Sequence, residues 1–429
     1  MKDYLNETID AISKIVHFDS TCQKPTPTTP FGQENFDCLC FFLDMAEEMG
    51  FKTNNYEGYA GEVIYGNGDE DNEFAILAHL DVVPAGLGWK YPPFDGIIAE
   101  GKIWGRGTTD DKGPAMCCLY ALKMLKDQNI TPKKKIKLIV GCNEESGWAC
   151  MKRYKELAHM PEYGFSPDAD FPVIVSEKGI LHVRMHFPFP VKERPFLYVQ
   201  SRLTANMVPD RCYSVPVDGV YDSVRMEKYG LRTKLPKLVS VGKSAHGSTP
   251  ELGKNAIEPM LRYYAEKNAR CAELVHTIFE DPYGLTKIQR DGEFLTMSPN
   301  VIRTKSDGLH VTYDIRYPST MTLKEVKELL AQYGVLYETL SHQAPLRADP
   351  ESDLVKTLLS VYEDCTGVKA QPIGIGGGTY ARALTHGVAF GPEMPGDEPT
   401  IHQPNEYITL ERVELLLKTY YEALKRLCC

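Results

Sequence analysis

The sequence lacks several features that would assign it to a specialised class of protein. Its 12 cysteines form no Cys-x-x-Cys pair, and the adjacent cysteines at 117–118 and 428–429 suit reduced thiols better than a disulfide framework. No apolar run approaches the roughly 18 residues that a membrane span needs. The N-terminal residues lack the apolar core of a signal peptide. These absences predict a cytoplasmic protein with no membrane partner.

Positive charge is also scarce. The chain has 48 lysine and arginine residues against 58 aspartate and glutamate residues, and its formal net charge is -10. Nucleic acids and anionic membrane surfaces favour basic proteins, so this charge argues against both as partners. The longest basic cluster, residues 133–135 with Lys137, precedes an apolar strand and is interpreted as a solvated strand entry.

The spacing of apolar residues indicates an α/β protein with an insertion. At 429 residues the chain is long enough for roughly two or three domains. Strands alternate with helices up to about residue 179 and again from about 346, which predicts a mostly parallel central sheet. Between 180 and 345 strands dominate, with helices near 254–268 and 323–333, which predicts an inserted α+β domain. A final helix over 410–427 is expected behind a Thr409 cap.

Five clusters of acidic or imidazole side chains occur in the α/β part of the chain. Each has an ordinary structural explanation: a hydrogen-bonded strand end, an acidic helix start, a capping turn, a Pro-Asp turn or a structural histidine. The most informative is His79 with Asp81 at the end of an apolar strand, where an imidazole and a carboxylate suit a metal ligand and its orienting acid. The others are Asp110 with Asp111, Glu144 with Glu145, Asp168, and His402.

Their combination favours a hydrolytic metal site. Two histidines and several carboxylates without cysteine suit Zn²⁺ or Mn²⁺. Open α/β sheets gather such residues at the carboxyl ends of their strands. Of two adjacent glutamates, one can bind metal while the other acts as a general base. A carboxylate able to bridge suggests two metal ions roughly 3.5 to 4 Å apart.

The ordered motifs resemble family 20 of the metallopeptidases, the relatives of aminoacylase, carboxypeptidase G and succinyl-diaminopimelate desuccinylase. The resemblance covers nearly the whole chain and rests on LAHLDVVP, GRGTTDDKGP, GCNEESG, FSPDADFPVIVSEKG, AHGSTPELGKNA and PGDEPTIHQPNEY. The segment GWKYPPFDG points to the PepV-type dipeptidase branch. The resemblance implies a discontinuous phosphorylase/hydrolase-like catalytic domain over 1–179 and 346–429. It also implies a ferredoxin-like α+β lid over 180–345.

The resemblance also implies two divalent metal ions, with Zn²⁺ ahead of Mn²⁺ and Co²⁺. Asp110 would bridge the ions, one of which is completed by His79 and Asp168 and the other by Glu145 and His402. The peptide bond between Asp110 and Asp111 is expected to be cis, as is common in the family.

For catalysis the resemblance implies that Glu144 activates water and then protonates the leaving amine, while Asp81 holds the imidazole of His79. In the lid, His246 and Asn206 would stabilise the tetrahedral oxyanion. Arg316, with backbone groups of Gly376, Gly377 and Gly378, would bind the terminal carboxylate of the substrate. The remaining histidines are assigned structural roles, at positions 17, 159, 182, 186, 276, 310, 342 and 386.

The sequence therefore predicts a metallodipeptidase that acts on short peptides with a free carboxylate. We expect a monomer, with a dimer as the alternative. Three other functions stay open: an N-acyl-amino-acid deacylase, a carboxypeptidase of the same family, and a metal-binding protein without catalysis. The last would have lost its base or a ligand, whereas Glu144 and all five ligand positions are present.

Overall fold

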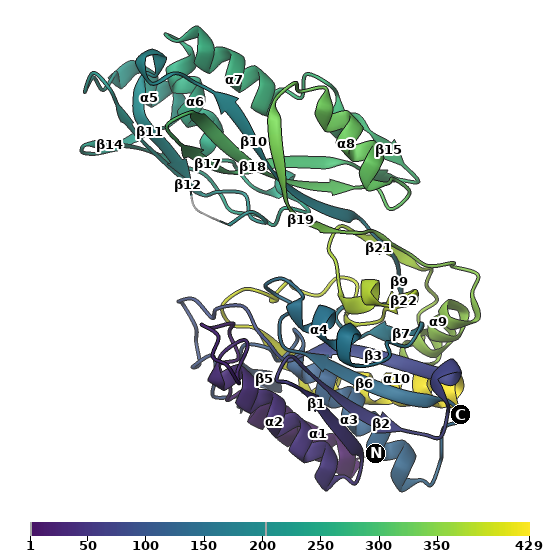
Figure 1. The fold of residues 1–429 in the computed structure, drawn as a ribbon. Helices are drawn as coiled ribbons and strands as arrows, with labels where there is room; N and C mark the ends of the chain where they lie inside the picture. Colours follow the sequence, from purple (N-terminus) through teal and green to yellow (C-terminus); the bar gives the residue numbers. More distant parts are fainter. Residues whose placement is uncertain (1, 202–203) are drawn as a thin grey trace. The chain divides into compact units, whose positions relative to one another are not determined.

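The computed structural model describes residues 2–201 and 204–429 of the chain. It divides into two compact units. The first joins segments from both ends of the chain, from purple through to yellow, and the second contains the teal-to-green middle (Figure 1). The sequence analysis set the domain boundaries at 179 and 346, and the chain leaves the first unit after Ser176 and returns at Ala348. A short later segment, Ile375–Gly378, also belongs to the second unit.

The central sheet of the first unit is mixed. Seven successive strands of this nine-stranded sheet follow the order β1-β2-β6-β3-β7-β22-β9. Strands run parallel from β6 through β3 and β7 to β22, whereas β1, β2 and β9 pair antiparallel with their neighbours. The expected α/β fold is confirmed, but the sheet is less parallel than predicted because antiparallel strands extend it at both edges. The strands are β1 (Lys52–Tyr56), β2 (Ala60–Tyr65), β3 (Glu73–His79), β6 (Lys135–Gly141), β7 (Tyr163–Ser166), β9 (Ile174–Glu177) and β22 (His386–Ala389).

Amphipathic helices pack around this sheet and build the core of the first unit. In α3 the residues Leu119, Leu122 and Leu125 are fully buried, as their helical spacing predicts. The last helix begins where expected, because the Thr409 hydroxyl accepts a hydrogen bond from the backbone N–H of Arg412 at 3.0 Å. The helices are α1 (Lys2–Ile15), α2 (Gln33–Glu48), α3 (Lys112–Asp127), α4 (Ala149–Leu157), α9 (Asp353–Thr366) and α10 (Leu410–Cys428), and a smaller sheet combines β4 (Ile97–Ala99), β5 (Lys102–Trp104) and β24 (Tyr407–Thr409).

The second unit is built on an eight-stranded antiparallel sheet. Its strand order is β13-β14-β12-β11-β17-β18-β10-β19. The strands are β10 (Gly179–Pro188), β11 (Phe196–Ser201), β12 (Arg211–Pro216), β13 (Arg232–Lys234), β14 (Lys237–Val241), β17 (Thr296–Thr304), β18 (Gly308–Tyr317) and β19 (Leu336–Gln343). The α-helices of the described part of this unit are α5 (Ser223–Tyr229), α6 (Ile257–Ala265), α7 (Ala269–Phe279) and α8 (Leu323–Ala331).

The two faces of this second sheet differ in polarity. Along β10, Leu181 and Val183 are buried in a core shared with α6, α7 and α8. The alternate residues His182, Arg184 and His186 are partly exposed on the opposite face. We call this opposite side the polar face of the second sheet.

No helix in the described part of the chain is long and apolar enough to cross a membrane. All 12 cysteines are free thiols.

Candidate metal centre

The predicted metal ligands are delivered by the ends of neighbouring parallel strands. His79 is the last residue of β3, Glu145 follows β6, and Asp168 follows β7. Because β6, β3 and β7 are adjacent and parallel, their carboxyl ends lie at one edge of the sheet. Two loops supply the remaining ligands, Asp110 before α3 and His402 before β24.

Asp110 lies between the two histidines. Its Oδ1 atom is 2.9 Å from His79 Nε2, and its Oδ2 atom is 2.9 Å from His402 Nε2. His79 Nε2 is also 3.5 Å from Asp168 Oδ2, and His402 Nε2 is 2.9 Å from Glu145 Oε1. The structure therefore gathers all five predicted ligands, and it divides them into the two predicted groups around one carboxylate.

The donor set fits a pair of divalent metal ions. His79 Nε2 is buried and makes no hydrogen bond, although carboxylate oxygens surround it. Donor atoms of His79, Asp110 and Glu145 lie within 4.8 Å of one another. Imidazole nitrogen with carboxylate oxygen is the ligand combination of hydrolytic zinc and manganese sites. These five residues are called the candidate metal centre below.

Burial and neighbouring charges shift the pKa values of the residues in the candidate metal centre. Burial raises the pKa of Glu145 to about 7, with a further contribution from Asp110. Burial likewise raises the pKa of Asp168 to about 6. For His402 burial acts in the opposite direction, but hydrogen bonds to Asp110 and Glu145 raise its pKa to about 11. Burial also opposes the charged form of Asp110, yet His402 and His79 hold the pKa of this carboxyl well below its usual range.

Asp81 supports the centre in a different way from the predicted one. The Nδ1 atom of His79 is 2.9 Å from the backbone oxygen of Asp81, whereas the nearest carboxylate oxygen of Asp81 lies 3.6 Å away. That carboxylate accepts the backbone N–H groups of Glu144 and Glu145 at 2.9 and 3.1 Å. Strand β3 ends at His79, so the alternation of side chains along a strand does not extend to position 81. Asp81 thus fixes the turn that presents both glutamates.

Glu144 is placed beside the metal ligands but bonds none of them. Its Oε1 atom accepts a hydrogen bond from the indole N–H of Trp148 at 3.1 Å. Burial raises the pKa of Glu144 well above its usual range, with nearby Asp168 and Glu145 adding to the effect. A carboxylate with a raised pKa, held by a neutral donor, is suited to exchanging a proton near neutral pH.

The loop that carries Asp110 is anchored by a residue the sequence analysis overlooked. The Oε1 atom of Glu406 accepts the backbone N–H groups of Gly107, Thr109 and Asp110 at 3.0, 3.0 and 3.2 Å. Its other oxygen is hydrogen-bonded to Arg106, and both side chains are buried. Glu406 lies in the same motif as His402, but a motif alone gives no sign that an acid will bind backbone amides. The cis bond that follows Asp110 is confirmed.

The predicted residues of the inserted domain also meet one another, within the second unit. The backbone N–H of Gly247 donates to the backbone oxygen of Asn206 at 2.7 Å, which places Asn206 beside the His246 turn. His246 Nδ1 is 2.7 Å from Ser248 Oγ, and a side chain at Gly376 would lie 3.1 Å from the Ser248 Cβ. Gly377 and Gly378 belong to the same short segment of this unit.

Arg316 is held by an aspartate that the sequence analysis missed. Asp314 Oδ1 accepts from Arg316 Nε at 2.7 Å, and Asp314 Oδ2 accepts from Nη2 at 3.0 Å. Arg316 Nη1 donates to the backbone oxygen of Gly376 at 3.2 Å. Burial opposes ionisation of Asp314, but the nearby imidazole of His182 and guanidinium of Arg316 lower its pKa to about 2. The spacing of two residues on one strand is the signal that could have identified the Asp314–Arg316 pair.

The model of "Peptidase family M20/M25/M40" matches residues 75–426. The chain is 35% identical to "Putative dipeptidase YtjP" of Bacillus subtilis, over 94% of this chain and 92% of that protein. It is 32% identical to a similarly named protein, SSP1012 of Staphylococcus saprophyticus, over 100% of this chain and 98% of that protein.

Two solved structures share the fold. The human carnosine dipeptidase 1 structure aligns with a TM-score of 0.61 at 15% identity, over 99% of this chain and 97% of that one. The dipeptidase Dug1p of Saccharomyces cerevisiae also gives a TM-score of 0.61, at 14% identity over 99% and 98% of the two chains. At such low identity the likeness concerns the fold alone.

Proposed function

This chain belongs to peptidase family M20/M25/M40 and is a peptidase, and from that premise we propose that it is a dinuclear metallodipeptidase. The observation that supports this most directly is the Asp110 carboxylate, which directs one oxygen to His79 and the other to His402, each at 2.9 Å. A carboxylate between two separate imidazoles suits a bridge between two ions. The names of the relatives at 35% and 32% identity point to dipeptides as substrates.

In this proposal His79 and Asp168 hold one ion, Glu145 and His402 hold the other, and Asp110 binds both. When bound, the ions supply Lewis-acid polarisation of the scissile carbonyl and make water a stronger acid. Zn²⁺ is our first choice of metal because imidazole and carboxylate ligands suit it, with Mn²⁺ and Co²⁺ as the alternatives.

Glu144 is assigned the proton transfers. Its carboxylate accepts a proton from the attacking water and later gives it to the leaving amine. The Trp148 indole keeps one carboxylate oxygen fixed, and Asp81 fixes the backbone on either side of the Glu144–Glu145 peptide. These contacts restrict Glu144 to one orientation, which lowers the entropic cost of the proton transfer.

The second unit is assigned substrate recognition. His246 and Asn206 would donate hydrogen bonds to the oxyanion of the tetrahedral intermediate. The Nε and Nη2 atoms of Arg316 are engaged by Asp314, and Nη1 bonds Gly376. A guanidinium has five N–H groups, and three of those of Arg316 are engaged by Asp314 and Gly376. The terminal carboxylate of the substrate would bind the remaining two.

Hydrolysis of a substrate panel tests this function. The metal-stripped protein is supplied separately with Zn²⁺, Mn²⁺ or Co²⁺ and offered free dipeptides, tripeptides and N-acetyl or N-succinyl amino acids. We expect metal-dependent cleavage of the dipeptides. Cleavage of the N-acyl compounds alone would identify a deacylase, and preference for tripeptides a carboxypeptidase. Inactivity on every substrate with both ions bound would reject the enzymatic proposal.

Glu144→Gln tests the assigned base. The variant keeps the metal ligands, so it should bind the same number of ions while kcat falls by about 10²- to 10⁴-fold. Glu156→Gln, an exposed change on α4 of the same unit, is the matched control and should keep full turnover. Wild-type rates in Glu144→Gln would remove Glu144 from the mechanism.

We also propose that the enzyme acts as a monomer in the reducing cytoplasm, a setting that suits its 12 free thiols. Sedimentation that finds only a tight dimer would contradict the monomer.

A further inference from the structure

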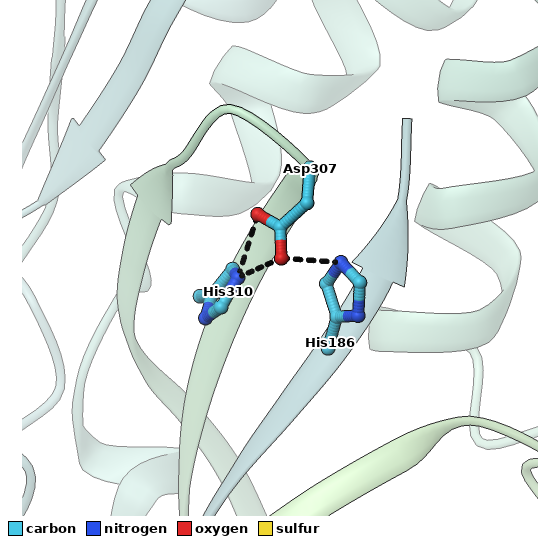
Figure 2. Close-up of side chains that lie close together, drawn as sticks. All are labelled: His186, Asp307 and His310. Carbon is cyan, nitrogen blue, oxygen red and sulfur yellow. Dashed lines mark hydrogen bonds and ion pairs between the residues drawn. The ribbon is translucent and has the colours of Figure 1, made fainter. Parts of the chain in front are cut away.

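A second group of metal-binding side chains lies on the polar face of the second sheet. His186 on β10 and His310 on β18 are directly opposite each other in the strand register, and Asp307 lies in the turn between β17 and β18. Figure 2 shows both imidazoles directed toward the carboxylate of Asp307. The Nε2 atom of His186 is 3.3 Å from Asp307 Oδ2, and His310 Nε2 is 3.1 and 3.3 Å from the two carboxylate oxygens.

These separations suit ligands of one metal ion. With bond lengths of 2.0–2.1 Å, a tetrahedral zinc site separates its ligand atoms by about 3.3 Å. The donor atoms of His186, Asp307 and His310 lie within 4.8 Å of one another. The Nε2 atom of His186 is buried and makes no hydrogen bond, although a carboxylate oxygen lies 3.3 Å away. In the candidate metal centre, His79 Nε2 is likewise buried without a hydrogen bond and close to a carboxylate oxygen.

His182 shows what distinguishes the group from an ordinary histidine–acid contact. Its Nε2 atom is also buried without a hydrogen bond and lies 3.5 Å from Asp314 Oδ2. There, however, Asp314 is neutralised by two hydrogen bonds from Arg316. The Asp307 carboxylate has two imidazoles as its described side-chain partners instead, and neutral imidazoles are metal ligands.

The turn that carries Asp307 is fixed before any ligand binds. The backbone N–H of Phe189 donates to the backbone oxygen of Asp307 at 3.2 Å. The buried side chain of Arg194 donates to the backbone oxygens of Phe189 at 2.7 Å and Ser306 at 3.0 Å. Gly308 lies next to His186, and a side chain there would fall 3.1 Å from its Nε2 atom and 2.1 Å from a backbone oxygen. The backbone of this turn is therefore held by buried structure, while the Asp307 side chain is 52% exposed.

We propose that His186, Asp307 and His310 bind one divalent transition-metal ion of the zinc class, with water completing the coordination. The ion would tie β10 to the turn between β17 and β18. His310 and Arg316 are six residues apart on β18, which is about 20 Å along a strand, so this ion is separate from the substrate-binding arginine. The proposal does not depend on the proposed function of the enzyme.

Arg303 allows the charge of the ligand to be tested. It pairs with His310 in the register of β17 and β18, and it lines a pocket together with that histidine, Arg184 and Lys305. A bound cation is repelled by this guanidinium, whereas a bound anion is attracted. Arg303→Gln should therefore strengthen Zn²⁺ binding a few-fold. Weaker Zn²⁺ binding in this variant, or stoichiometric binding of inorganic phosphate that it abolishes, would overturn the cation site in favour of an anion site.

The main experiment counts metal ions per chain. Full-length wild-type protein, His310→Ala and Asp307→Asn are dialysed against a series of Zn²⁺ buffers, and bound zinc is measured by mass spectrometry. We expect each variant to hold one ion fewer than the wild type, with the weakest binding step reduced by at least about 100-fold. Because the result is a difference between variants of one chain, it does not depend on the ions held by the first unit.

Two controls keep the count interpretable. His276→Ala removes an exposed histidine from another histidine–acid pair, with Glu280 on α7, and should leave the count unchanged. In the presence of a chelator Asp307→Asn should unfold cooperatively at about the wild-type temperature, which excludes misfolding as the cause of the lost ion. Zn²⁺ should then raise this temperature less in the variant than in the wild type. Equal zinc content in the wild type, His310→Ala and Asp307→Asn would reject the site.

Discussion

Replacement of Glu406 by glutamine should strongly destabilise the first unit. Glu406 and Arg106 are 0% and 1% exposed, and Glu406 is the one described carboxylate that pairs with Arg106. The Nε and Nη2 atoms of Arg106 are buried without a hydrogen bond, and the guanidinium lies 5.3 Å from the ring centre of Trp89. Glutamine keeps the shape and an amide oxygen for the backbone N–H groups, so the substitution mainly removes the charge opposite Arg106.

The expected cost follows from this burial. Removing one partner of a buried ion pair costs about 3–5 kcal/mol, because the other charge remains buried without compensation. That is a large fraction of the roughly 5–15 kcal/mol that stabilises a typical domain. The double variant Arg106→Met with Glu406→Gln should recover much of the loss, since neither charge then remains.

Urea unfolding followed by tryptophan fluorescence measures this cost. The three tryptophans, at positions 89, 104 and 148, all lie in the first unit, so their fluorescence follows that unit. A chelator removes the contribution of bound metal. Glu57→Gln, which breaks an exposed pair with Arg153, is the matched control and should leave the midpoint unchanged. A cost below about 1 kcal/mol for Glu406→Gln would refute the reasoning, because Arg106 would then not depend on that charge.

Three further predictions concern the chemistry. His246→Ala should lower kcat by about 10²- to 10³-fold with unchanged metal content, and metal loss measured in that variant would make His246 a ligand instead. Arg316→Lys should raise KM for dipeptides by about 10- to 100-fold but leave dipeptide amides unaffected in steady-state assays. Zn²⁺ affinity measured by calorimetry should increase from about pH 6 to 8, because ligands bind only after losing their protons. Burial and Asp110 raise the pKa of Glu145 to about 7. Burial lowers the pKa of His402, but the carboxylates of Asp110 and Glu145 outweigh it and raise this pKa to about 11. Affinity that is independent of pH would contradict this.

The helices and strands follow from local patterns, but the pairing of strands does not. Apolar spacing places α10 to within a few residues, because a buried helical face repeats every turn. The antiparallel pairing of β2 with β6 depends on contacts between residues distant in sequence, so alternation of helices and strands predicted too parallel a sheet. The expected contact between the Asp81 carboxylate and the imidazole of His79 is likewise replaced by a contact to the Asp81 backbone oxygen, because Asp81 lies beyond the end of β3.

The side chains that do the chemistry are easier to predict than those that hold them. Imidazoles and carboxylates in ordered motifs mark His79, Asp110 and His402 as candidate ligands whatever their local backbone. Glu406 accepts backbone N–H groups of the Asp110 loop, and these partners become visible only when segments distant in sequence meet. The pair of Asp314 and Arg316 is local, and its spacing on one strand is the signal for it. A histidine outside any motif, such as His310, looks structural until strand pairing places it opposite another histidine.

The buried acids of the first unit give a physical reason to expect bound cations. This reason does not rest on the family to which the chain belongs. Burial raises the pKa of five carboxyl groups around the two imidazoles, at Asp81, Asp111, Glu144, Glu145 and Asp168. Asp110 is the exception, because His79 and His402 stabilise its charge. So many acids in one buried site raise the free energy of the metal-free fold, and two divalent cations would offset that cost. Removal of the ions by a chelator should therefore lower the free energy of unfolding of the first unit more than that of the second. Without the ions, the buried carboxylates of the first unit repel one another.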